Sequence, residues 1–114
     1  MSIANDNSSG NKGNNGPFQI GMLRDKSCVG HEVLVLDDTV SQLDFPVGST
    51  YALISVEAET GNGVRYWSDS SGPSSTEGHF FEDGGVFDIT GLLNLRRFKV
   101  IGVSAATLMV SYFK

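Results

Sequence analysis

The sequence predicts an all-β protein, a jelly-roll-like antiparallel β-sandwich of two sheets and about eight short strands, with an extended N-terminal arm. Charged residues make up only 18% of the chain, and fourteen of its 114 residues are glycine, a balance typical of many turns rather than of helices. Short apolar runs alternate with turn residues about every 8–12 positions. Two of these runs carry apolar side chains on both faces, which two packed sheets can bury and a single sheet cannot.

The strands are predicted from alternating polarity. The clearest covers residues 51–57, YALISVE, where Ala52, Ile54 and Val56 point one way and the residues between them the other. The expected core includes Ile54, Val56, Val100, Leu108, Val110 and Tyr112. The other expected strands cover residues 17–23, 31–36, 63–67, 79–82, 85–89, 97–103 and 106–113.

Two connections have the residues of tight hairpin turns. Asn62-Gly63 and Asp83-Gly84 adopt positive φ at low cost, and each lies between two of the expected strands. We therefore expect the strands on either side of each turn to pair with each other. Residues 92–98 can hold one short turn of helix.

The chain divides into a polar arm, residues 1–16, and a sandwich domain, residues 17–114. Eleven of the first sixteen residues are Asn, Ser or Gly, which bury too little apolar surface to offset the cost of ordering. We expect the arm to be disordered in the free protein and to be held by a partner in an assembly. Its candidate partner-binding residues are Met1, Ile3, Asn5, Asn11, Lys12 and Asn15.

Charge and cysteine content argue against several classes of protein. The formal net charge of −5 argues against a nucleic-acid binder, which needs a basic face against phosphate. Arg96, Arg97 and Lys99 form a local basic patch, which we interpret as a solvated strand edge that resists unwanted pairing. The chain has a single cysteine, no signal-peptide pattern at its start and no apolar run long enough to cross a membrane. These features predict synthesis in a reducing cytoplasm and no membrane partner.

No residue pattern predicts an enzyme, a cofactor or a metal site. Cys28 and His31 are close in sequence, but a buried cysteine near a strand start is expected here rather than a catalytic dyad. His31 and His79 are the only histidines, and no pair of ligands has the spacing of a zinc site. The acidic pairs at 37–38 and 82–83 are interpreted as turn residues, because neighbours in a strand face opposite sides.

One loop, residues 68–78, carries the remaining candidates. Tyr66 and Trp67 precede it and should face opposite sides of their strand, one in the core and one at the surface. An exposed aromatic ring beside Ser, Asp and Gly can stack on a sugar or anchor a protein interface, or it can close one end of the sandwich. The candidate partner-binding residues here are Tyr66, Trp67, Asp69 and Pro73.

Three stretches carry a resemblance. They read ALISVEAETGNGVRYWSDSSGPSSTEG (residues 52–78), FDITG (87–91) and RRFKVIGVSAATLMVSYFK (96–114). In this order of strands and loop they resemble a family of small virion proteins of tailed bacteriophages. The loop departs from the family's pattern, because Ser70-Ser71 before Gly72 makes it one residue longer.

The resemblance implies a non-enzymatic structural protein of a phage particle, first of all a capsid decoration (cement) protein, or else a head–tail or tail component. It implies the major capsid protein and further copies of the chain as partners. The location would be the virion, after synthesis in the cytoplasm of the host bacterium. The residues themselves leave a second class open, a carbohydrate-binding β-sandwich that uses Trp67 and its loop.

Overall fold

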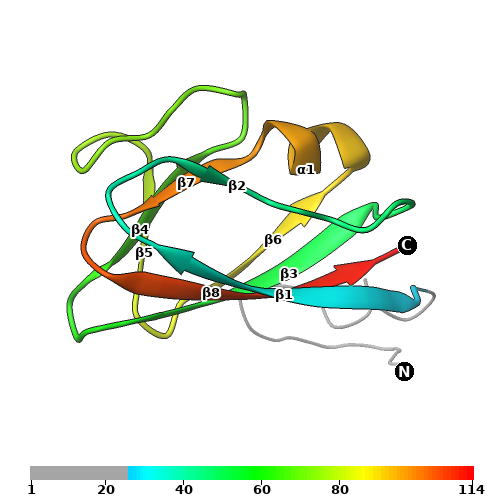
Figure 1. The fold of residues 1–114 in the computed structure, drawn as a ribbon, viewed down its shortest axis with the longest axis horizontal. Helices are drawn as coiled ribbons and strands as arrows, with labels where there is room; N and C mark the ends of the chain where they lie inside the picture. Colours follow the sequence, from blue (N-terminus) through cyan, green and yellow to red (C-terminus); the bar gives the residue numbers. More distant parts are fainter. Residues whose placement is uncertain (1–25) are drawn as a thin grey trace, which may run out of the picture.

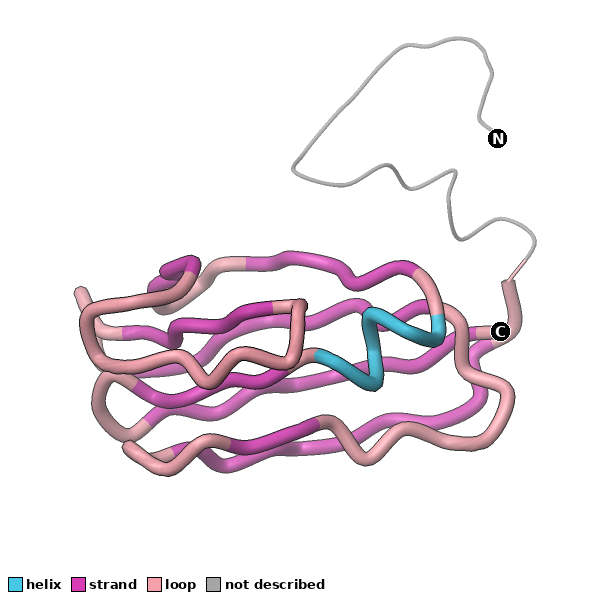
Figure 2. Tube along the Cα trace, turned by 90° about the horizontal axis from the view of Figure 1, so that it is seen from above, coloured by secondary structure: helices cyan, strands magenta, loops and turns pink. Residues whose placement is uncertain are grey.

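Two four-stranded antiparallel sheets pack face to face in the computed structural model, which describes residues 26–114. Figure 1 shows the two layers, and Figure 2 shows the strands running lengthwise with connections at both ends. The expected all-β sandwich is therefore confirmed for this part of the chain. The strand expected at 17–23 and the arm at 1–16 lie outside the described residues.

The strand order is that of a jelly roll. The first sheet has the order β1-β8-β3-β6, built from β1 (Cys28–Leu36), β8 (Ala106–Phe113), β3 (Tyr51–Ala58) and β6 (Val86–Thr90). The second has the order β2-β7-β4-β5, built from β2 (Ser41–Gln42), β7 (Lys99–Gly102), β4 (Gly63–Trp67) and β5 (His79–Glu82). The predicted helical turn is α1 (Leu92–Arg97), which connects β6 to β7.

The two expected hairpins are wrong. β3 and β4 lie in different sheets, and so do β5 and β6, so each tight turn carries the chain across the sandwich. The expected positive φ is present at Gly84, but in the other turn it falls on Gly61 and not on Asn62 or Gly63. The pairing differs because Val56 on β3 and Val64 on β4 are both buried, and facing sheets bring them to one core from opposite sides.

These crossing connections meet at one end of the sandwich, on the left in Figure 1, which we call the arch end. It consists of residues 37–40, 57–62, 82–85 and 103–105. Backbone bonds join the connections to one another and to the strand ends: the Gly102 amide donates to the Asp37 carbonyl at 2.8 Å, and the Asp83 amide donates to the Asn62 carbonyl at 2.8 Å. The arch end is therefore a bonded unit rather than a set of separate loops.

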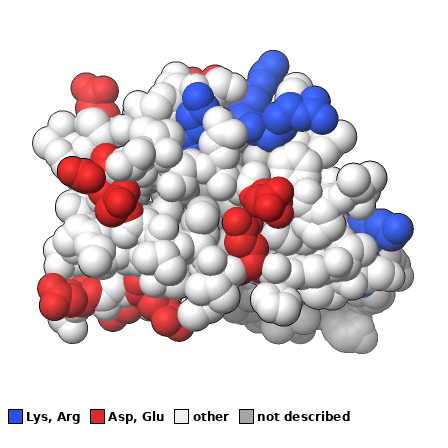
Figure 3. All heavy atoms as spheres, in the orientation of Figure 1, with Lys and Arg blue, Asp and Glu red and all other residues white. Residues whose placement is uncertain are grey.

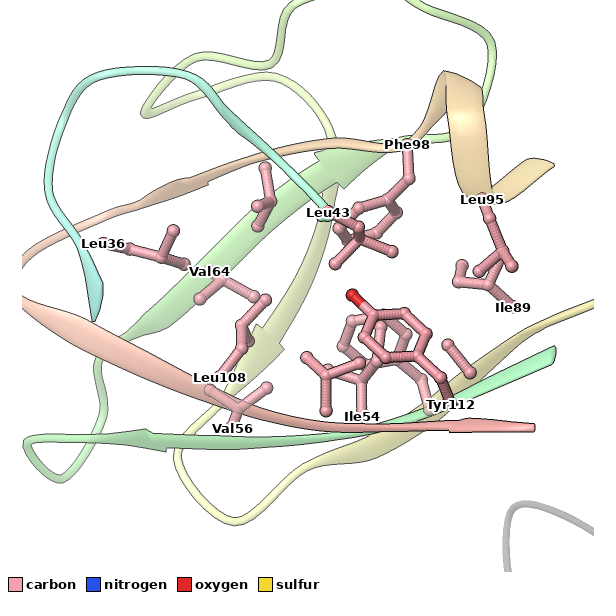
Figure 4. Packing of buried hydrophobic residues seen from close by; sticks show 14 of the residues in the cluster. Leu36, Leu43, Ile54, Val56, Val64, Ile89, Leu95, Phe98, Leu108 and Tyr112 are labelled. Atoms are coloured by element: carbon pink, nitrogen blue, oxygen red, sulfur yellow. The ribbon is translucent and has the colours of Figure 1, made fainter. Parts of the chain in front are cut away.

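The core lies between the sheets, and every residue predicted for it is buried there. Ile54, Val56, Val100, Leu108, Val110 and Tyr112 are between 0% and 2% exposed. Figure 4 shows Leu43 and Phe98 facing Leu108, Ile54 and Tyr112 across the gap between the layers. Leu95, the buried residue of α1, closes the core beside Ile89.

Candidate interaction surface

The β4–β5 pair is the one place in residues 26–114 where strands consecutive in sequence are also neighbours in a sheet. The loop between them is the stretch at 68–78 that carries the sequence-predicted candidates. Because β4 begins at the arch end and runs away from it, this loop follows the far end of β4. The loop therefore lies beside the start of β7 and the end of α1.

Tyr66 faces the core. Its ring stacks on Phe87 with the centroids 4.7 Å apart and the planes 3° apart, and Phe98 lies 5.2 Å away. Burial raises the pKa of the Tyr66 hydroxyl above its ordinary value, and the nearby charge of Asp88 raises it further. The Tyr66 ring therefore packs in the core and does not belong to the exposed surface beside the 68–78 loop.

Trp67 lies on the other face, as the alternation in β4 predicts. Its strand position is directly opposite Lys99 of β7, and its ring meets the His79 ring edge-on with the centroids 5.3 Å apart. The indole is half-buried, so part of it is open to solvent. The expectation that one residue of the pair enters the core and the other reaches the surface is confirmed.

The first half of the loop is bonded to the end of α1. The Ser70 amide donates to the Arg97 carbonyl at 3.0 Å, with Ser70 in the left-handed region at φ 76°. Asp69 Oδ1 accepts from the Ser71 amide at 3.0 Å. This backbone hydrogen bond from Ser71 lowers the pKa of the Asp69 carboxyl, and the charge of Arg97 lowers it further. Asp69 is therefore a charged turn-former beside a basic side chain.

The second half is held by Arg65, to which the sequence had assigned no role. Its guanidinium donates from Nε to the Ser75 carbonyl at 3.0 Å and from Nη1 to the Gly78 carbonyl at 2.9 Å. It also lies over the Phe80 ring, 5.1 Å from the centroid. A single basic residue facing outward just before a Ser- and Gly-rich loop is the sequence signal that would have found it.

Pro73 is buried within the loop, and a Cβ built on Gly78 would lie 3.2 Å from the proline Cβ. Pro73 was a candidate contact, but its side chain packs inward and shapes the loop instead. Four of the sequence-predicted residues are thus brought to one region, with Trp67 and Asp69 at the surface and the other two beneath it. The arm candidates Met1, Ile3, Asn5, Asn11, Lys12 and Asn15 lie outside the described residues.

Basic side chains gather beside this loop. Arg96 and Arg97 are exposed on the last turn of α1, and Lys99 follows at the start of β7. Figure 3 shows Lys and Arg together over α1 and β7, whereas Asp and Glu lie mainly elsewhere on this face. We call the group of Trp67, Arg96, Arg97 and Lys99 the Trp67 surface.

One residue of each acidic pair, Asp37 and Asp83, forms a turn hydrogen bond. Asp37 Oδ1 accepts from the Thr39 amide at 2.8 Å, and Asp83 Oδ1 accepts from the Ala58 amide at 3.1 Å, as expected for turn residues. Cys28 is exposed, so the expected burial is wrong: β1 begins three residues earlier than predicted and starts with a bulge. Within residues 26–114, no three His, Cys, Asp or Glu side chains are grouped so that they could hold a metal ion.

Comparisons with known proteins found no match among family models, curated proteins or solved structures. In the part of the chain that the structure describes, no helix is long and apolar enough to cross a membrane. Trp67 is paired in register with Lys99, and Arg96 and Arg97 are exposed at the end of α1 just before it; Trp and Arg are residue types enriched at protein interfaces.

Proposed function

We propose that the chain is a non-enzymatic structural protein of a bacteriophage particle, a capsid decoration protein that binds the major capsid protein and stabilises the shell. A place at the head–tail junction or in the tail is the nearest variant of the same proposal. The resemblance of residues 52–78, 87–91 and 96–114 to small virion proteins motivates it. The jelly roll is compatible with it, since viral capsid proteins use this fold, as do lectins and enzymes of other kinds.

The observation that carries the proposal is how the polar side chains are used. Arg65 and Asp69 hold the 68–78 loop, and Glu32 and Asp88 accept hydrogen bonds from core tyrosines. These groups tie the fold together and do not converge on a site where a substrate could react. The exposed groups of the described residues include Arg96, Arg97 and part of the Trp67 ring, residue types enriched at protein contacts.

Binding to capsids tests the proposal. Purified protein is mixed with expanded capsids that lack it, the capsids are pelleted, and the bound protein is measured together with the heat stability of the shell. We expect saturable co-sedimentation and a higher disruption temperature for decorated capsids. Protein that remains in the supernatant at micromolar concentration, with an unchanged disruption temperature, would exclude the decoration role.

A truncated chain lacking residues 2–16 separates the arm from the sandwich in the same assay. We expect it to melt at nearly the same temperature as the full chain and to bind capsids more weakly, because the arm is predicted to act through a partner. Equal binding by both chains would assign the capsid contact to the sandwich and make the Trp67 surface the next region to test.

A carbohydrate-binding β-sandwich is the second candidate, and the outward-facing Trp67 favours it. Aromatic rings stack on the apolar faces of sugars. Trp67 is the chain's single tryptophan, so its fluorescence reports directly on any ligand that covers it. Titration with host cell-wall polysaccharide should change this emission if the protein is a lectin. Under the structural proposal the emission stays constant with polysaccharide.

A further inference from the structure

The arch end is strongly acidic. It holds six exposed carboxylate residues, Asp37, Asp38, Glu57, Glu59, Glu82 and Asp83. The ranges that define it contain no Lys or Arg. Because its connections are bonded to one another through backbone groups, these carboxylates are presented together at one end of the sandwich. Figure 3 shows acidic side chains at the left, where the arches lie in Figure 1.

The Trp67 surface has the opposite charge and a different position. Lys99 and Trp67 are at the start of β7 and the end of β4, while both strands meet the arch end at their other termini. The Arg97 carbonyl accepts from the Ser70 amide at 3.0 Å, which joins the end of α1 to the loop. Lys99 is thus the cation paired in register with Trp67, and Arg97 is joined through its carbonyl to the loop that follows Trp67.

We propose that the Trp67 surface of one copy binds the arch end of a second copy. This inference rests on the proposed function for its choice of partner, a further copy of the chain, and adds the surfaces that meet. Copies with a net charge of −5 repel each other in general. Contact between the basic group over α1 and β7 and the carboxylate-rich end replaces that repulsion with attraction.

The composition of the Trp67 surface also fits a docking role. Trp and Arg are the residues that most often dominate the energy of protein interfaces. Arg96 and Arg97 can each bind a carboxylate through two hydrogen bonds, a geometry that a lysine at the same place cannot offer.

The two surfaces differ, so the contact is heterologous rather than two-fold symmetric. Such a contact leaves one Trp67 surface and one arch end free on every pair, and further copies add until a ring closes or a filament grows. The predicted assembly therefore increases in mass with protein concentration. It also dissociates as salt is added, because the attraction is between exposed charges.

Charge exchange tests the contact directly. One variant carries Arg96→Glu and Arg97→Glu, and a second carries Glu59→Lys and Glu82→Lys, whose carboxylates lie at the arch end. Sedimentation velocity at low salt should show that the full-length natural chain associates. Each variant alone should raise the apparent dissociation constant by about tenfold or more. An equimolar mixture of the two should form heterodimers, because each supplies the surface that the other has lost.

The matched control carries Lys26→Glu and Lys114→Glu, which changes the net charge by the same amount as the arginine variant. It should associate as the natural chain does, apart from the general repulsion. Thermal melts verify that every variant folds. If the arginine variant does not, Arg96→Gln with Arg97→Gln replaces it, and a smaller weakening in the same direction is expected.

Four results would overturn the inference: a natural chain that stays monomeric at low salt, variants that associate as it does, a mixture that fails to form heterodimers, or a control as weak as the arginine variant. Loss of binding to a duplex DNA probe in the arginine variant, with self-association unchanged, would also overturn it and make the surface a polyanion site.

Capsid binding is measured separately. Self-association without capsid binding removes the proposed function and leaves this contact standing, whereas capsid binding by a strict monomer does the reverse.

Discussion

The Tyr112 hydroxyl donates a 2.6 Å hydrogen bond to Glu32 Oε1, and the same oxygen accepts from the Asp44 amide at 3.1 Å. Tyr112 is on β8 and Glu32 on the neighbouring strand β1, while Asp44 is in the connection from β2 to β3. One carboxylate thus joins a buried ring of the first sheet to a segment that lies over the end of the core. The Phe45 ring, 6.5 Å from the Tyr112 ring, packs at the same place.

Removing this hydroxyl should destabilise the protein without changing the packing. We expect Tyr112→Phe to lower the free energy of unfolding by about 1–3 kcal/mol, because Glu32 loses a donor in a partly buried site. Denaturant melts of Tyr112→Phe, Glu32→Gln and the double variant form a complete cycle. A coupling energy of about 0.5 kcal/mol or more is expected, and additive effects would mean that the two groups do not stabilise each other.

The three tyrosines of the chain should resist ionisation in the folded protein. Burial raises the pKa of Tyr51, Tyr66 and Tyr112 above the ordinary value of 10.0, and carboxylates beside them raise it further. Tyrosinate absorbance of the native protein should therefore rise well above pH 10, whereas protein unfolded in urea titrates near about pH 10. Native absorbance that follows the unfolded curve would show that these hydroxyls are open to water.

The same shifts set the alkaline limit of stability. A raised pKa in the folded state favours the protonated tyrosine, so its contribution is complete below about pH 10 and is lost as the pH rises towards the folded-state pKa. Urea melts between about pH 9 and pH 11 should show falling stability. Tyr112→Phe should lose less over this interval than the natural chain. An identical loss in both proteins would assign the alkaline effect to other groups.

Leu108 tests the core. It is fully buried between the sheets, so Leu108→Ala should cost about 2–5 kcal/mol in denaturant melts. Its neighbour Met109 points outward and is 37% exposed, which makes Met109→Ala a matched control with an expected change under about 1 kcal/mol. A loss below about 1 kcal/mol at Leu108 would place that face of β8 at the surface.

Gly63 tests the crossing from β3 to β4. A Cβ at this position would overlap the carbonyl oxygen of Phe81 on the paired strand β5. Any residue other than glycine would therefore push the backbones of β4 and β5 apart. Gly63→Ala should therefore destabilise by about 1–3 kcal/mol. At Gly72 the nearest atom to an added Cβ is 3.7 Å away, and Gly72→Ala should change stability by less than about 1 kcal/mol. Equal effects at both positions would contradict the pairing of β4 with β5.

The sequence by itself determined where most strands lie and which side chains enter the core. Alternation in 51–57 and 106–113 correctly placed Ile54, Val56, Leu108 and Val110, because the side-chain period of a strand is a local property of the backbone. The same alternation correctly placed Tyr66 and Trp67 on opposite faces of β4, because adjacent residues of a strand always point to opposite sides. β2 was missed, since a strand of two residues is defined by its bonds to β7 and has no pattern of its own.

Only the tertiary structure decided how the strands are joined. A glycine with positive φ reverses the chain equally well within one sheet or across two, so turn residues could not distinguish a hairpin from an arch. The choice depends on which apolar faces meet, a property of strands far apart in sequence. The Trp67 surface has the same origin, because Lys99 reaches Trp67 only through the pairing of β4 with β7. Pro73 is buried in a loop whose second half accepts two hydrogen bonds from Arg65.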